Sequence, residues 1–101
     1  MKLIEQLEKI ELREEIFSGV WKAVVNTKEV SVLTIEPGKE IELHEHKDDH
    51  EIYIVLKGIV KINGIICTEG NIRICNCGES HRAANTSNSE VIILAIKIDA
   101  A

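Results

Sequence analysis

Aromatic residues are scarce in this sequence, and what replaces them indicates the class of fold. Only 3 % of the residues are aromatic, although 45 % are hydrophobic. A hydrophobic share of this size excludes a disordered chain, because such a chain lacks the apolar surface that a core needs. Ile, Val and Leu supply most of the hydrophobic share, and β-branched side chains favour strands. The 101 residues suit one compact domain.

The sequence also lacks any cluster of basic residues. Lys and Arg never gather into a run, and the formal net charge is −5. Nucleic acids are bound through a concentrated positive surface, and an anionic membrane attracts basic segments. The composition therefore predicts neither a nucleic-acid partner nor a membrane partner.

No long hydrophobic run is present. The longest, residues 91–96, is far too short to span a membrane. Charges interrupt the first fifteen residues, MKLIEQLEKIELREE, every two or three positions, so this segment does not resemble a signal peptide. Three cysteines form no framework spacing and are expected to be free thiols. We therefore expect a soluble, cytoplasmic protein.

Most of the sequence shows the period of two that is typical of strands. Apolar residues at helical spacing predict a short helix or an arm over residues 1–12, before this period begins. Strands are expected at 20–25, 30–35, 40–46, 51–56, 59–62, 65–68, 72–75, 81–85 and 91–98. Asn63-Gly64 is a strong hairpin signal between two of them. The pattern predicts an all-β sandwich or barrel, with an arm at 1–19 and a single barrel domain at 20–101.

The segment HEHKDDHE, residues 44–51, concentrates histidines and acids. On a strand, His44 and His46 would project to the same side, because residues two apart share a face. Neutral imidazoles together with a carboxylate suit a transition metal. A polar, solvated loop explains the same eight residues, so this segment alone leaves both interpretations open.

The wider spacing resembles the cupin superfamily. The first cupin motif, G-x5-H-x-H-x3,4-E-x6-G, matches at every fixed position within PGKEIELHEHKDDHEIYIVLKG. The second, G-x5-P-x-G-x2-H-x3-N, matches within GNIRICNCGESHRAAN except that Asn76 replaces its proline. The two motifs and the stretch between them cover residues 38–85, about half of the chain. Two motifs in the right order are specific for the fold and much less so for the reaction.

The resemblance implies a double-stranded β-helix, a small all-β barrel of two antiparallel sheets. It also implies that one divalent transition metal, with Fe, Mn, Ni and Zn as candidates, is bound inside the barrel by His44, His46, Glu51 and His81. Four protein ligands on an octahedral ion leave two positions for a substrate, water or O₂. Loss of the motif's proline at Asn76 loosens a turn but removes no ligand.

Strand alternation places other side chains relative to this site. If Glu51 points inward, so does Tyr53, and its hydroxyl could act in catalysis by orienting a substrate. A buried tyrosine that only fills the core is the alternative. His50 would then point outward, although it could replace Glu51 as a ligand.

Three further groups are open to more than one interpretation. Cys75 and Cys77 share a face and could form a second metal or redox site, or they could simply be small buried side chains. Arg73 and Arg82 are expected to point outward, because their neighbours are expected to point inward. The inward polar candidates besides the ligands are then Glu40, Glu42 and Asn85.

Two functions of different classes follow from the resemblance. One is a metal-dependent enzyme that acts on a small oxygenated metabolite, by dioxygenase, decarboxylase, isomerase or lyase chemistry. The other is a barrel that binds or senses a small ligand without converting it. Single-domain cupins commonly form homodimers, and we expect one here through the apolar outer positions of the strands.

Overall fold

The computed structural model describes residues 14–24 and 30–100, and these residues form ten strands without a helix. The expected helix or arm over residues 1–12 lies outside this part of the chain. The strands are β1 (Glu14–Phe17), β2 (Val20–Val24), β3 (Val30–Ile35), β4 (Glu40–His44), β5 (Asp49–Lys57), β6 (Val60–Ile62), β7 (Ile65–Cys67), β8 (Ile72–Cys75), β9 (His81–Ala84) and β10 (Val91–Asp99). No membrane-spanning helix is found in the described residues.

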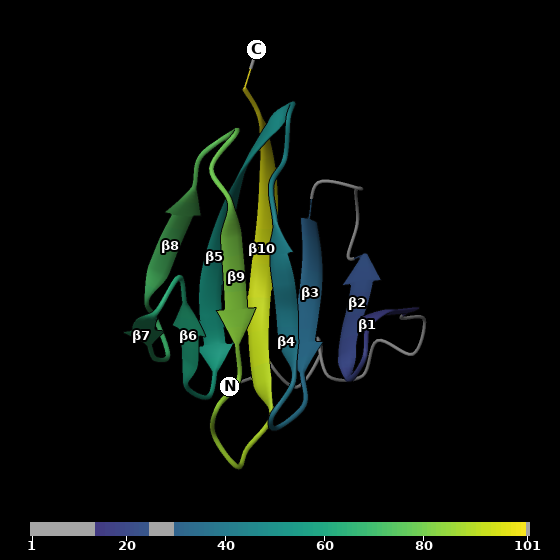
Figure 1. Cartoon of the computed structure of the whole chain (residues 1–101), viewed down its shortest axis with the longest axis vertical. Coiled ribbons are helices and arrows are strands. Elements are labelled where there is room, and N and C mark those ends of the chain that lie inside the picture. Colours follow the sequence, from purple (N-terminus) through teal and green to yellow (C-terminus); the bar gives the residue numbers. More distant parts are fainter. Residues whose placement is uncertain (1–13, 25–29, 101) are drawn as a thin grey trace.

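The strands pair into two antiparallel sheets that face each other (Figure 1). The larger sheet has six strands in the order β1-β2-β3-β10-β5-β8, and the smaller has four in the order β4-β9-β6-β7. Within the described residues, strand pairing does not join the two sheets into one closed barrel. The expected all-β architecture of two antiparallel sheets is confirmed.

Alternation along the strands divides buried from outer positions. In β5 the side chains of Glu51, Tyr53 and Val55 are buried, while the residues between them are partly exposed. These side chains belong to the layer between the two sheets, where aliphatic residues form one continuous core. A site built on the inner face of β5 is therefore largely shielded from water.

The turn at Asn63-Gly64 connects β6 to β7 as the sequence predicts. Both residues have positive φ, 50° for Asn63 and 78° for Gly64, and Ile62 pairs directly with Ile65. A two-residue turn with two left-handed residues matches the twist of an antiparallel hairpin. This hairpin closes one end of the smaller sheet, beside the strand that carries His81.

Candidate metal centre

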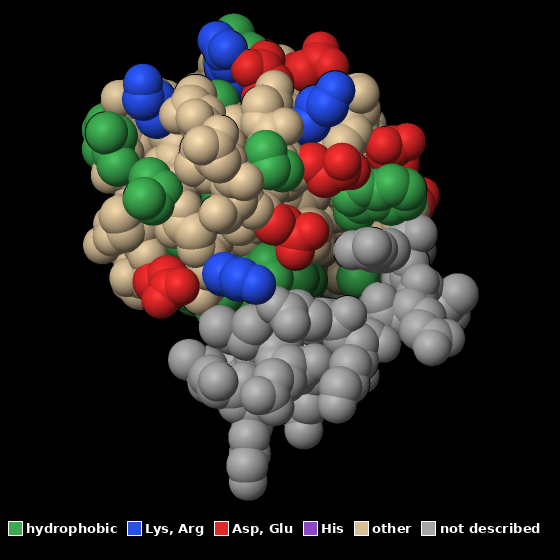
Figure 2. All heavy atoms as spheres, turned by 90° about the horizontal axis from the view of Figure 1, so that it is seen from below, with side chains coloured by type: hydrophobic (Ala, Val, Ile, Leu, Met, Phe, Trp, Pro, Cys, Tyr) green, Lys and Arg blue, Asp and Glu red, His purple; other side chains and the backbone are tan. Residues whose placement is uncertain are grey.

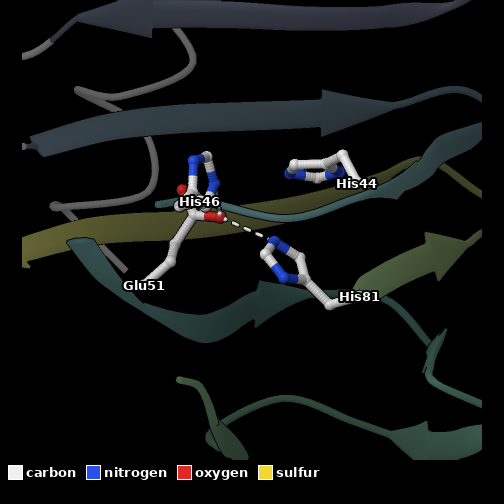
Figure 3. A group of neighbouring side chains, drawn as sticks. All are labelled: His44, His46, Glu51 and His81. Atoms are coloured by element: carbon white, nitrogen blue, oxygen red, sulfur yellow. Dashed lines mark hydrogen bonds and ion pairs between the residues drawn. The ribbon is translucent and has the colours of Figure 1, made fainter. Parts of the chain in front are cut away.

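Four side chains from the two cupin-like motifs meet between the sheets. His44 ends β4, His46 follows it in the next loop, Glu51 lies on β5, and His81 begins β9. Figure 3 shows the four side chains pointing toward one another. One ligand atom from each residue lies within 4.8 Å of those from the others. The structure thus brings together three imidazoles and one carboxylate that are up to 37 positions apart in the sequence.

Strand pairing explains how His44 and His81 come together. Their Cα atoms are direct partners in the β4–β9 ladder. The register shifts between Ile41 and His44, and such an irregularity redirects the side chains that follow it. The two imidazole centroids are 4.2 Å apart.

His46 corrects one expectation from the sequence. Strand β4 ends at His44, so His46 does not project from the same strand. The loop is held instead by Gly78, whose N–H donates to the carbonyl of His46 at 2.8 Å. Gly78 has a φ of 78°, a conformation that favours glycine. The turn before His81 forms without the motif's proline, because the Glu79 N–H donates to the carbonyl of Asn76 at 2.9 Å.

The distances within the cluster suit a single transition-metal ion. One Glu51 oxygen, Oε1, lies 3.2 Å from Nε2 of His46 and 3.1 Å from Nε2 of His81. Ligands at roughly 2.0–2.2 Å from a common ion lie about 3 Å apart when adjacent and about 4.2 Å apart when opposite. The distances from Glu51 Oε1 to the two Nε2 atoms match adjacent positions on an ion. The largest separation in the cluster, 4.8 Å, needs only a small adjustment to match opposite positions.

Two of the imidazoles are oriented by backbone carbonyls. Nδ1 of His44 lies 2.7 Å from the carbonyl of Glu42, and Nδ1 of His81 lies 3.3 Å from the carbonyl of Glu79. A carbonyl oxygen can only accept, so each Nδ1 carries the proton and donates it. Metal-binding histidines are usually fixed in this way, with the other nitrogen turned to the ion.

Without a metal, Glu51 and His81 form a charged pair. Burial raises the pKa of Glu51, but hydrogen bonds from His81 and Tyr53, with the charges of the nearby imidazoles, outweigh it and lower the pKa to about 2. Burial lowers the pKa of His81, but hydrogen bonds with Cys75 and Glu51 outweigh it and raise the pKa to about 10. A cation in the cluster would therefore replace a proton on His81 and keep the same carboxylate partner.

His44 differs from His81 in its electrostatics. Burial lowers the pKa of His44, and the charges of the other two imidazoles lower it further, although the carbonyl of Glu42 opposes them. Its imidazole is therefore held in the neutral form, which is the form that binds a metal.

A cavity of about 90 Å³ opens beside the cluster. Three of the cluster residues and Tyr53 line it, together with apolar side chains such as Phe17. Its polar lining also includes Lys22, Ser31 and Lys97, which the sequence did not point to. Strand alternation was the one sequence signal for these three residues. Each lies two positions from a buried apolar residue and so shares its inward face.

Tyr53 lies where the sequence placed it. It is 1 % exposed, and its ring centroid is 5.6 Å from that of His81. Burial raises the pKa of its phenol, as does the charge of Glu51 beside it, so the hydroxyl stays protonated. The hydroxyl could therefore donate a hydrogen bond to the carboxylate or to a molecule in the cavity.

The remaining candidates lie outside the cluster. His50 accepts a hydrogen bond at Nδ1 from the N–H of Cys77, at 2.9 Å. Asn85 is buried and supports a turn, since its amide donates to the carbonyls of Ile35 and Ser89. In the described part of the chain, Cys75 and Cys77 take part in no second group of metal ligands.

The expected direction of Arg73 was wrong. Arg73 pairs with Tyr53 and shares the inner face with buried Cys75, while Ile72 and Ile74 are exposed. Arg82, in contrast, points outward as expected, and pairs with exposed Glu40. The outer face of β8 is therefore apolar. On this strand, hydrophobic side chains do not indicate which face points into the core.

Comparison with known proteins shows the family of this chain. The family model of the cupin domain matches residues 31–97, more than half of the chain. The chain belongs to the cupin family. All four clustered residues lie within the match, as do most of β3 and β10.

Two relatives of this cupin come from Thermotoga maritima. An oxalate-binding protein is 33 % identical over 70 residues, which cover 65 % of this chain and 58 % of the relative. The match thus spans less than two thirds of that protein's length. The crystal structure of a protein described as a predicted oxalate decarboxylase has a TM-score of 0.77 at 28 % identity, over 91 % of this chain and 95 % of the other.

The same fold occurs at much lower sequence identity. The cupin domain of Drosophila melanogaster CENP-C has a TM-score of 0.77 at 14 % identity, over 86 % of this chain and 74 % of that one. A likeness at this identity concerns the fold alone. The function of this cupin must therefore be argued from its own site.

Proposed function

We propose that His44, His46, Glu51 and His81 bind one divalent transition metal and that the cavity beside them admits a small oxygenated molecule. The observation that carries this proposal is the cluster itself, with four ligand atoms within 4.8 Å of one another. Carbonyl groups hold two of its imidazoles in the tautomer that suits a metal. Iron, manganese, nickel and zinc are the candidate ions, because this ligand set accepts each of them.

An ion held here would act as a Lewis acid or would activate water or O₂. The residues of this chain would do the rest. Phe17, Leu33 and Ile41 make part of the cavity wall apolar and so limit the access of water. The protonated Tyr53 hydroxyl would orient the bound molecule by a hydrogen bond, which is the catalytic role we assign to it. This arrangement supports an enzyme of the dioxygenase, decarboxylase, isomerase or lyase type.

A binding function without turnover is the second candidate. The relative described as an oxalate-binding protein favours it, and the relative described as a predicted oxalate decarboxylase favours catalysis. Oxalate is therefore the first ligand to test for both. Calorimetric titration of the metal-loaded protein with oxalate should give saturable binding that the metal-free protein lacks.

Product analysis of the same mixture separates the two candidates. Formate and CO₂ released over hours would show decarboxylation, while bound but unchanged oxalate would support the binding function. Absence of metal-dependent binding for oxalate would remove it as a ligand of this cupin.

We also propose that this cupin is a cytoplasmic homodimer, with residues 20–101 as the barrel domain and 1–19 as its arm. Three free cysteines suit a reducing compartment. Exposed isoleucines on the outer face of the larger sheet supply the dimer contact, among them Ile72, Ile74 and Ile98. Light scattering coupled to size-exclusion chromatography should give twice the chain mass of 11.3 kDa, and a monomer would refute the dimer.

A further inference from the structure

We propose that Lys22, Lys97 and Ser31 form a second binding subsite in the cavity, which selects a small dicarboxylate over neutral and singly charged molecules. In this arrangement one carboxylate would reach the metal cluster and the other would contact the lysines and the serine. The inference rests on the proposed function, because it assumes that the cluster holds a cation. It adds a ligand class that the four metal-binding residues do not specify.

Strand register places the three residues around one cavity. Lys97 on β10 is the direct partner of Glu51 on β5, so it extends from the inner face next to the cluster. Ser31 on β3 pairs with Ala95, the inward residue of β10 that comes before Lys97. Lys22 on β2 pairs with buried Leu33 and approaches from the far side of β3. All three side chains line the cavity of about 90 Å³.

None of the three side chains has a partner among the residues that the structure describes. Arg82, for comparison, has Glu40 within 2.6 Å. Among residues 14–24 and 30–100, no carboxylate lies within ion-pair distance of Lys22 or Lys97, and no group hydrogen-bonds to the Ser31 hydroxyl. Ser31 is only 5 % exposed and lines the cavity, so its hydroxyl can hydrogen-bond to a molecule bound there.

Lysines often extend their ammonium groups into water while their stems cover apolar surface. That explanation could apply to one lysine beside a cavity. It does not explain why two lysines from separate strands and a serine hydroxyl line the same small space, where lysine is uncommon.

Charge and size both favour a dicarboxylate. A divalent ion and the Glu51 carboxylate leave one net positive charge, and the two ammonium groups raise it to three. A dianion neutralises most of this charge, and a neutral molecule none of it. The cavity volume is about 90 Å³. A water-sized group occupies on the order of 10–15 Å³ of a volume measured in this way, so the cavity admits roughly six to nine non-hydrogen atoms. Dicarboxylates of two to four carbons fall within or near this limit.

The test compares malonate with acetate on protein loaded with Mn²⁺. Malonate can also chelate the ion through both carboxylates. A preference of the wild type for malonate over acetate is therefore no evidence for the subsite. The change in that preference between variants is decisive. Lys22→Met and Lys97→Met keep the apolar stem and remove the charge, and Ser31→Ala removes the hydroxyl. Lys61→Met is the matched control, because Lys61 is exposed on β6 outside this cavity.

We expect calorimetry to show a loss of about tenfold in malonate affinity for each lysine variant and about fivefold for Ser31→Ala. Acetate affinity should stay within about twofold of wild type, and Lys61→Met should change neither. Thermal melting and metal content, measured on each sample, show that the variant is folded and loaded.

Two results would overturn the subsite. One is malonate affinity within about twofold of wild type in either lysine variant. The other is an equal loss for acetate and malonate, which would place the effect at the metal. A wild-type protein that holds none of Mn²⁺, Fe²⁺, Ni²⁺ and Zn²⁺ after reconstitution would refute the proposed function itself, and the subsite with it.

Discussion

The buried carboxylate of Glu51 should stabilise the metal-free fold through its contact with His81. Glu51 is 5 % exposed, and its Oε1 accepts from Nε2 of His81 at 3.1 Å. A hydrogen bond to a charged group contributes about 1.5–3 kcal/mol, against about 0.5–1.5 kcal/mol for a neutral one. Glu51→Gln keeps an acceptor oxygen but loses the charge. The second bond, from Tyr53, is weakened too. We therefore expect a loss of about 2 kcal/mol.

The pH at which this loss is measured matters. The pKa of Glu51 is lowered from 4.5 to about 2, so its stabilising contribution is complete above pH 4.5 and disappears as the pH falls through 2. The pKa of His81 is raised from 6.5 to about 10, so its contribution is complete below pH 6.5 and disappears as the pH rises through 10. Both are complete between pH 4.5 and 6.5.

Glu40→Gln provides a matched control for this measurement. Glu40 pairs with Arg82 at the surface, where the two side chains are 36 % and 54 % exposed. Exposed pairs contribute about 0.2–1 kcal/mol. Urea unfolding of the chelator-treated proteins at pH 5.5 should therefore show a larger loss for Glu51→Gln than for Glu40→Gln, and the difference should shrink toward pH 10. Equal losses, or a difference that ignores pH, would refute the assignment.

Three other expectations follow from the same residues. Metal binding at pH 7.5 should release about one proton per ion, because His81 is protonated in the metal-free protein; calorimetry in buffers of different ionisation enthalpy would measure it, and zero release would contradict the raised pKa of His81. Gly64→Ala should destabilise the protein by about 1 kcal/mol or more in urea unfolding, since φ is 78° there; an unchanged midpoint would contradict the role of this turn. Ile74→Glu should convert the proposed dimer into a monomer in light scattering without loss of metal, because Ile74 is 58 % exposed on the outer face; a persistent dimer would place the interface elsewhere.

Local chemistry made much of the fold predictable. The Asn63-Gly64 turn depends on two adjacent residues that tolerate positive φ, and a short sequence reveals it. The inward direction of Glu51, Tyr53 and Val55 follows from strand alternation once one of them is assigned to the core. The motif spacing likewise selected the four residues that the structure brings together.

The errors arose where tertiary contacts decide the outcome. His46 leaves the strand because its carbonyl bonds to Gly78, which lies 32 positions later. Strand alternation predicts an outward Arg73 only if its neighbours Ile72 and Ile74 lie in the core, and both are exposed. The outer face of β8 is itself apolar. Hydrophobicity therefore predicts that Ile72 and Ile74 point inward, whereas the pairing of β8 with β5 turns Arg73 inward.

The residues that line the cavity could not be predicted from the sequence, again because tertiary contacts decide them. Lys22 and Lys97 lie on strands that are separated in the sequence but both flank β3. Alternation alone says which face each occupies. It does not say that a space remains between the sheets for both side chains to enter.

Basic and acidic side chains are mixed on one face of the described part of the molecule. On the face shown in Figure 2, lysine and arginine side chains are interspersed with acidic ones and do not gather. The acidic net charge of −5 agrees with this distribution.

Elemental analysis of the untagged protein, purified without added metal or chelator, tests the central claim most directly. His81→Ala removes a ligand of the proposed site. His50→Asn is its control, because His50 neighbours Glu51 but accepts from Cys77 outside the cluster, as an asparagine oxygen also could. We predict about one iron, manganese, nickel or zinc ion per chain in the wild type and in His50→Asn, and none in folded His81→Ala. A wild type without metal after reconstitution, or full occupancy in His81→Ala, would contradict the metal site.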